Sequence, residues 1–130
     1  MTQQETLGVA VIGAGMAGAA HAAGWRAATT VRSPFPAQVR LVAVADIAEP
    51  LARSVAGRYG YERTETDWRA LLTADDVDIV SVVVANHLHR EIVEELLAAG
   101  KHVLCEKPLS DSIEDAQAMA EAARKSPQVA

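Results

Sequence analysis

The chain has 130 residues, a formal net charge of −5, one cysteine, and hydrophobic side chains at half of its positions. This length suffices for one domain with a sizeable core but is short for an enzyme that must also enclose a substrate. The acidic balance argues against binding to nucleic acid or to an anionic membrane, and a lone cysteine cannot form an internal disulfide. We therefore expect one domain from the reducing cytoplasm.

The first predicted element is an apolar strand that ends in a glycine-rich turn. Leu7 to Ile12 lead directly into Gly13-Ala14-Gly15-Met16-Ala17-Gly18, after which an alanine-rich stretch favours a helix. In a strand–turn–helix of this kind, Gly13 permits the tight turn, Gly15 lets phosphates approach the backbone, and Gly18 lets helix and strand pack closely. The pattern predicts a dinucleotide site, and the alternative is a buried strand and helix joined by a glycine turn.

The uncharged stretch from Leu7 to Trp25 also has the length of a membrane span or a signal peptide. Five glycines interrupt it, and Glu5 precedes it in place of a basic cluster. Both of these readings are therefore rejected.

The rest of the chain alternates between predicted strands and helices. Thr29 to Gln38 contains two prolines that break any helix, so it is expected to be a connecting loop. Apolar and β-branched runs predict strands, and periodic stretches closed by glycine, or opened by an Asp or Ser cap, predict helices. In chain order these are strand Val39–Ala45, helix Pro50–Tyr59 stopped by Gly60, short strand Tyr61–Thr66, helical turn Trp68–Leu72 capped by Asp67, strand Asp78–Val84, a helix from Leu88 to Gly100, strand His102–Cys105, and a helix from Ser112 to about Lys125.

This alternation predicts an α/β fold with a doubly wound parallel sheet, because parallel neighbours need crossover connections. In such a sheet the ligand lies outside the carboxyl ends of the strands. Those ends carry Gly13, Asp46, Ala85-Asn86 and Glu106-Lys107. The unusual residues are therefore expected at one edge.

Asp46 is the candidate for choosing the cofactor. A carboxylate after the second strand accepts hydrogen bonds from the adenosine ribose hydroxyls, which favours NAD. It follows Gly18 by 28 residues, and the proline-containing loop accounts for the extra length. Its alternative role is to cap the next helix. NADP stays possible because Arg53 lies nearby, although Ile47 next to Asp46 brings no positive charge.

Three polar side chains, Asn86, His87 and His89, follow the fourth strand and could reach a nicotinamide ribose or a substrate. A metal site is rejected because two histidines two residues apart on a helix do not share a face, and no carboxylate or cysteine completes the ligand set. For His89 the other reading is a helix N-terminal residue that contacts only backbone and solvent.

Lys107 follows the fifth strand and precedes Pro108, which fixes the backbone while the lysine projects into the cleft. A cation there orients a substrate hydroxyl or lowers its pKa. The alternative is a surface salt bridge to Glu106. Cys105 is interpreted as a small buried strand residue and not as a nucleophile.

Taken together, these residues resemble the N-terminal domain of the Gfo/Idh/MocA family of NAD(P)-dependent oxidoreductases. The resemblance spans nearly the whole chain. It rests on the glycine fingerprint with His21, on Val44-Ala45-Asp46, on Asn86-His87-Leu88-His89, and on the stretch Ala99-Gly100-Lys101-His102-Val103-Leu104-Cys105-Glu106-Lys107-Pro108-Leu109. Val84-Ala85 departs from the Thr-Pro that the family commonly has there, which puts one contact near the nicotinamide in doubt.

The resemblance implies reversible oxidation of a hydroxyl on a sugar or polyol, with Lys107 as the catalytic lysine. The cofactor is expected to be NAD, with NADP possible. The residues expected to bind it are Gly13, Ala14, Gly15, Met16, Ala17, Gly18, Asp46, Ile47, Val84, Ala85, Asn86, His89, Glu106, Lys107 and Pro108.

The chain stops at Ala130, close to where a sixth strand is expected and before the substrate domain that the family carries. Family members usually form homo-oligomers through that domain, so the same is expected here. Two hypotheses stay open, the nucleotide-binding half of a longer enzyme and a free-standing dinucleotide-binding or sensing module. An exposed, unfinished sheet edge favours the first. A third, a methyltransferase with a similar glycine loop, is weaker.

Overall fold

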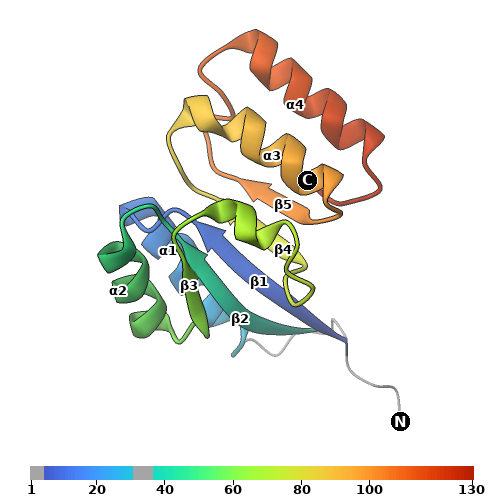
Figure 1. The fold of residues 1–130 in the computed structure, drawn as a ribbon. Helices are drawn as coiled ribbons and strands as arrows, with labels where there is room; N and C mark the ends of the chain where they lie inside the picture. Colours follow the sequence, from blue (N-terminus) through green and yellow to red (C-terminus); the bar gives the residue numbers. More distant parts are fainter. Residues whose placement is uncertain (1–4, 31–36) are drawn as a thin grey trace.

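The computed structural model describes residues 5–30 and 37–130, which form one parallel five-stranded sheet in the order β3-β2-β1-β4-β5 (Figure 1). The strands are β1 (Thr6–Ile12), β2 (Gln38–Ala45), β3 (Arg63–Glu65), β4 (Ile79–Val82) and β5 (His102–Cys105). The helices are α1 (Met16–Ala28), α2 (Glu49–Tyr59), α3 (His89–Ala98) and α4 (Ile113–Lys125), with 3₁₀ turns η1 (Trp68–Leu71) and η2 (Asn86–Leu88). The predicted fold class is confirmed.

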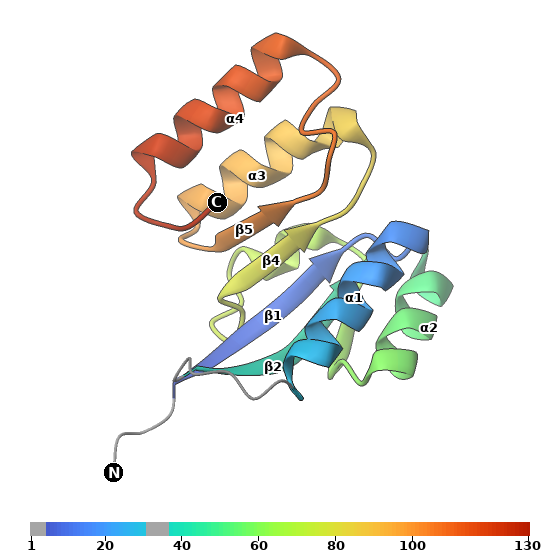
Figure 2. The same cartoon turned by 180° about the vertical axis from the view of Figure 1, so that it is seen from behind.

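The sheet is covered on both faces, with α1 and α2 on one side and α3 and α4 on the other (Figures 1 and 2). Alternate residues of one strand enter the two cores: Val11 packs with Ala22 of α1, whereas Ile12 packs with Leu96 of α3. Strands buried on both faces need mostly apolar sequence, which is why hydrophobic residues dominate the buried parts of β1, β2 and β4. The exception is the buried Ser81 of β4, whose hydroxyl accepts a hydrogen bond from Trp25 Nε1 at 2.8 Å. This two-sided burial leaves the carboxyl edge as the place for polar chemistry.

Most predicted boundaries agree with the structure to within two residues. Gly60 is left-handed at φ +79° and ends α2, and the Ser112 hydroxyl accepts a hydrogen bond from Asp115 N–H at 3.1 Å at the start of α4. The turn after Asp67 is 3₁₀, and a further 3₁₀ turn precedes α3. Positions 31–36, the centre of the expected proline loop, lie outside the described residues.

At the open edge of the sheet, β5 contacts the last residues of the chain. Val103 N–H donates to Val129 O at 2.9 Å, and Val129 N–H donates to His102 Nδ1 at 2.9 Å.

Within residues 5–30 and 37–130, no helix is long and apolar enough to cross a membrane.

Gly8 in β1 allows a close backbone approach that no other residue permits. A Cβ there would lie 1.8 Å from Asp76 O. We expect Gly8→Ala to lower the free energy of unfolding by about 1–3 kcal/mol, because the neighbouring backbone would have to move. The matched controls are Gly24→Ala and Gly57→Ala, at helical positions with open space, which should each stabilise by about 0.5–1 kcal/mol. Urea unfolding of the three variants measures both signs, and a neutral Gly8→Ala would contradict the account.

Candidate nucleotide-binding site

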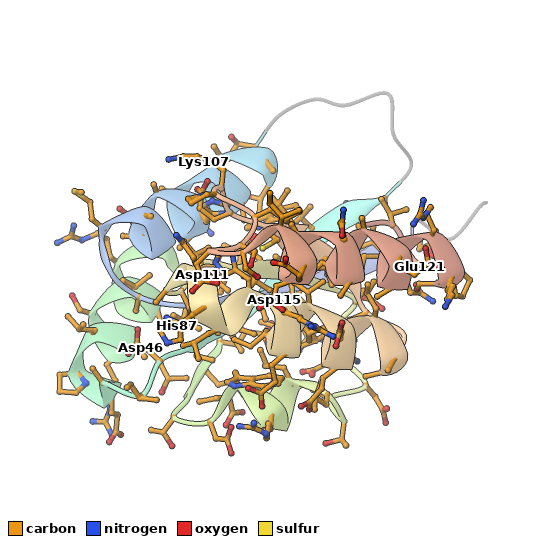
Figure 3. All side chains as sticks on the ribbon, turned by 90° about the horizontal axis from the view of Figure 1, so that it is seen from above. Asp46, His87, Lys107, Asp111, Asp115 and Glu121 are labelled. Carbon is orange, nitrogen blue, oxygen red and sulfur yellow. The ribbon has the colours of Figure 1, made fainter. Side chains whose placement is uncertain are left out.

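A cavity of about 360 Å³ opens at the carboxyl ends of β1, β2 and β4. Six of the residues expected to bind the cofactor line it, together with others from η1 and the start of α3. The six are Gly13, Gly15, Asp46, Ile47, Val84 and Ala85. Figure 3 shows Asp46, His87 and Lys107 toward one end of the molecule and Glu121 at the other. The predicted concentration of unusual residues at one edge is therefore what the structure has.

The glycine turn has the geometry that its sequence predicts. Gly13 has φ +106°, and a Cβ on it would lie 1.9 Å from Val83 O of the chain leaving β4. A Cβ on Gly18 would lie 1.9 Å from Gly13 O, so α1 can pack this closely on the turn only with glycine there. Nothing lies within 4 Å of the corresponding position at Gly15. The turn is thus closed toward the protein and open toward the cavity.

Helix α1 begins at this turn without a side-chain cap. Gly15 is its N-cap residue and carries no side chain, and the first turn holds no acidic residue. The first N–H groups of a helix lack partners within the helix, and the helix dipole makes this end attractive to an anion. A pyrophosphate therefore fits the bare N-terminus of α1, beside Gly13 and Gly15.

Asp46 links the end of β2 to two backbone N–H groups. Its Oδ2 accepts a hydrogen bond from Ala14 N–H at 2.8 Å, and its Oδ1 accepts one from Ala48 N–H at 2.7 Å at the start of α2. The second bond closes a turn ahead of α2, whose N-cap residue is Ala48 without a side-chain cap, so Asp46 does not cap that helix. A carboxylate has about four acceptor sites, so two remain for ribose hydroxyls. The Ala14 contact was not foreseen, and it fixes the carboxylate against the glycine turn.

Two exposed apolar side chains flank this region. Met16 at the start of α1 and Ile47 after Asp46 are each 92% exposed. Side chains of this size gain nothing from exposure, since burying one typically stabilises by about 1.5–3 kcal/mol. They are suited to cover the flat, apolar part of a ligand.

The far wall of the cavity consists of residues that the sequence reading did not assign to the site. They are Thr66, Trp68, Leu88, Glu91 and Ile92. The Arg69 guanidinium stacks over the Trp68 ring at 4.6 Å from its centroid and pairs with Glu91. Trp68 could have been suspected because it directly follows the capping residue Asp67. Only the packing of η1 against α3, however, brings it to the cavity.

His89 lies in the interior, with 1% of its surface exposed. Its Nδ1 is 3.0 Å from Leu109 O, and its Nε2 is 3.0 Å from Val84 O. Both ring nitrogens face main-chain oxygens, so neither points to a cofactor. The geometry favours the alternative in which His89 contacts only the backbone. The ring is buried, however, where that alternative expected contact with solvent as well.

The segment Glu106-Lys107-Pro108 lies beside this cavity and does not line it. It follows β5, three strand positions from β2, which at the usual spacing is about 14 Å away. A ligand that contacts both Asp46 and Lys107 must therefore be extended along the sheet edge. A dinucleotide has that shape.

Glu106 is held by two hydrogen bonds, and Lys107 is left exposed. His21 Nε2 of α1 lies 2.9 Å from Glu106 Oε2, and Lys107 N–H donates to Glu106 Oε1 at 2.7 Å. Thus the glutamate that was weighed as a salt-bridge partner of Lys107 is paired with His21. The Lys107–Pro108 peptide bond is cis.

The contact with His21 lowers the pKa of Glu106 below its ordinary 4.5, aided by the Lys107 N–H bond. A depressed carboxyl pKa contributes stability above the ordinary pKa, and this stability is lost as the pH falls through the folded-state pKa. We expect an NMR titration to place Glu106 below 4.5, and His21→Phe to move it up towards that value. A Glu106 pKa that stays unchanged in His21→Phe would contradict the contact.

Cys105 has the properties of a packed strand residue. It is half-buried at the end of β5, and burial raises the pKa of its thiol to about 11. A thiolate is therefore scarce at neutral pH.

Among the residues that the structure describes, no group of three His, Cys, Asp or Glu side chains could hold a metal ion.

Comparison with known proteins decides the family. Residues 7–130 match the model of a family described as an oxidoreductase family with an NAD-binding Rossmann fold. The chain belongs to this family, Gfo/Idh/MocA. The resemblance noted from the sequence motifs is thereby confirmed.

The relatives of this Gfo/Idh/MocA domain include dehydrogenases of sugars and polyols. The levoglucosan dehydrogenase of Pseudarthrobacter phenanthrenivorans is 36% identical over 120 residues, which are 92% of this chain and 31% of that protein. The inositol 2-dehydrogenase of Salmonella typhimurium is 34% identical over 92% of this chain and 34% of the relative. The chain thus spans about a third of the length of the relatives it matches.

Solved structures agree with the fold. An oxidoreductase domain protein from Kribbella flavida superposes with a TM-score of 0.87 at 43% identity, over 93% of this chain and 32% of that one. A levoglucosan dehydrogenase in complex with NADH and L-sorbose superposes with a TM-score of 0.89 at 35% identity, over 96% and 34%. The fold described above is therefore shared with both of these proteins.

Proposed function

We propose that this domain binds NAD as the nucleotide-binding part of an oxidoreductase that acts on a hydroxyl of a sugar or polyol. The observation that carries the proposal is the glycine turn opening onto the bare N-terminus of α1, with Asp46 beside it. It is supported by relatives named as levoglucosan and inositol dehydrogenases, and by one solved in complex with NADH and L-sorbose.

In this proposal the pyrophosphate binds to the backbone of residues 13–18, and the adenosine ribose binds to Asp46. Trp68 and Ile47 offer apolar surface to the adenine. Val84, Ala85 and Asn86 follow β4, from which they would meet the nicotinamide ribose. When bound, the nicotinamide supplies the acceptor for the hydride that leaves the hydroxyl-bearing carbon.

Lys107 is the proposed catalytic residue. Its ammonium would donate a hydrogen bond to the substrate hydroxyl and lower the pKa of that hydroxyl, so that the proton departs as the carbon is oxidised. The Glu106 carboxylate is engaged by His21 and by Lys107 N–H, so it holds the turn. The base that accepts the proton is expected in a substrate domain, as are the contacts that form a homo-oligomer. We place the enzyme in the cytoplasm.

Binding and turnover by the 130-residue chain test this proposal together. We expect calorimetry to detect NAD binding to the chain and no binding of S-adenosylmethionine, since Asp46 and the turn suit a dinucleotide. We also expect no turnover of any polyol, because the base is expected in a substrate domain and none is assigned among the residues that the structure describes. Binding of S-adenosylmethionine but not of NAD would contradict the proposal, and turnover by the chain alone would contradict the missing base.

A further inference from the structure

His89 is a buried polar residue that the proposed mechanism does not use. It is the first residue of α3 and one of the larger fully buried side chains, with 1% exposure. Burying an imidazole is unfavourable unless its nitrogens find partners. Each ring nitrogen lies within hydrogen-bond distance of a carbonyl oxygen, Nδ1 at 3.0 Å from Leu109 O and Nε2 at 3.0 Å from Val84 O.

The two carbonyl groups belong to different segments of the sheet edge. Val84 follows β4 and lines the cavity, and Leu109 comes two residues after Lys107. The ladder between β4 and β5 continues only to the hydrogen bond from Glu106 N–H to Val82 O, at 3.0 Å. Beyond this bond the His89 ring lies between the two segments, within hydrogen-bond distance of both.

In each hydrogen bond between His89 and the main chain, the imidazole ring must be the donor. A carbonyl oxygen only accepts, so each link needs an N–H on the ring. A ring with one proton makes one link, and a ring with two protons makes both. The ring itself is buried, so it holds the spacing between the segments from the interior.

The same loop is held on its other side by His21. The Glu106 carboxylate is bonded to His21 of α1, and the main chain at Leu109 is in contact with His89 of α3. Lys107 lies between these two points. Its main chain is fixed from both faces of the sheet while its side chain stays exposed.

We infer that His89 is a positioning residue that sets the place of Lys107 relative to the end of β4. The inference rests on the proposed function, because it assigns His89 to the geometry of the reaction. His89 itself touches neither cofactor nor substrate in this account. Displacing a catalytic group by about 1 Å can cost about 100-fold in rate, so a link of this kind has a measurable effect.

The test uses His89→Phe, which fills the volume without a donor, and His89→Gln, which retains one. The matched control is His102→Phe, a histidine at the amino end of β5 that is also bonded to the main chain. In the chain itself, we expect amide exchange of Lys107 and of residues 109–112 to be about tenfold faster in His89→Phe, with residues 13–18 unchanged.

In the protein expressed from its complete reading frame, we expect kcat of His89→Phe to fall about 10–100-fold, with KM for NAD within about threefold. His89→Gln should recover at least about a third of kcat, and His102→Phe should keep it. Unchanged exchange, a loss in KM alone, or kcat equal to wild type would overturn the inference. So would the failure of both His89 variants to fold, which would make His89 a residue of the fold.

The two proposals fail in distinguishable ways. If wild type oxidises no sugar or polyol, the proposed function fails, while the exchange experiment still decides whether His89 holds the loop. If wild type is active and His89→Phe matches it, only the inference about His89 fails.

Discussion

The Asp46→Ala variant of this chain is expected to bind NAD about 10–100-fold more weakly than wild type. Hydrogen bonds to a charged group contribute about 1.5–3 kcal/mol, and the variant also loses the bond that holds Ala14 N–H of the glycine turn. NADP binding should fall by less than about threefold, since removing the carboxylate also removes its repulsion of a 2′-phosphate. Calorimetric titration with both cofactors measures the difference.

Glu49→Gln is the matched control for Asp46→Ala. It removes an acidic charge three residues further on, where Glu49 pairs with Arg53 on the exposed side of α2. A surface pair of this kind contributes little, so NAD binding should stay within about twofold. Equal losses of NAD and NADP in Asp46→Ala would defeat the assignment of Asp46 to the ribose.

The Lys107→Met variant, in the protein expressed from its complete reading frame, is expected to lose about 100–10,000-fold in kcat. This is the usual contribution of a group that assists proton transfer. NAD binding to the chain should stay within about threefold, because the proposed pyrophosphate and ribose contacts at residues 13–18 and Asp46 remain and Lys107 does not line the cavity. Steady-state kinetics and calorimetry together separate these two effects.

Lys125→Met serves as the control for Lys107→Met. Lys125 ends α4, where it pairs with Glu121 at 3.2 Å, so its removal changes the net charge equally. Its kcat should equal that of wild type. A Lys107→Met enzyme that retains most of its kcat, or that loses NAD binding in parallel with kcat, would remove Lys107 from the chemistry.

The helices and strands of this fold could be predicted from the sequence because the start, end and type of each element depend on a few neighbouring residues. Gly60 adopts the left-handed conformation that ends α2, Ser112 caps the helix that follows it, and β4 is mostly apolar because both of its faces are covered. The boundaries of some strands were predicted less exactly. The strand expected over Tyr61–Thr66 is only Arg63–Glu65, because Tyr61 turns under α1 and donates its hydroxyl to Ala22 O.

The site was predictable where its residues follow a strand and not where it depends on packing. Gly13, Asp46 and Val84 each come at or just after a strand end, so the topology alone brings them together. Trp68 reaches the cavity only because η1 packs beside α3. The burial of His89 depends on Leu109, which is 20 residues away in the chain. No periodicity or motif in the sequence carries that contact.

The most direct test of the account is a substrate screen with the protein expressed from its complete reading frame. Sugars and polyols, with levoglucosan and myo-inositol among them, are offered with NAD and with NADP, and reduction of the cofactor is followed. We expect oxidation of at least one such compound, with a higher kcat/KM for NAD than for NADP. Binding of NAD without oxidation of any sugar or polyol in the panel would contradict it.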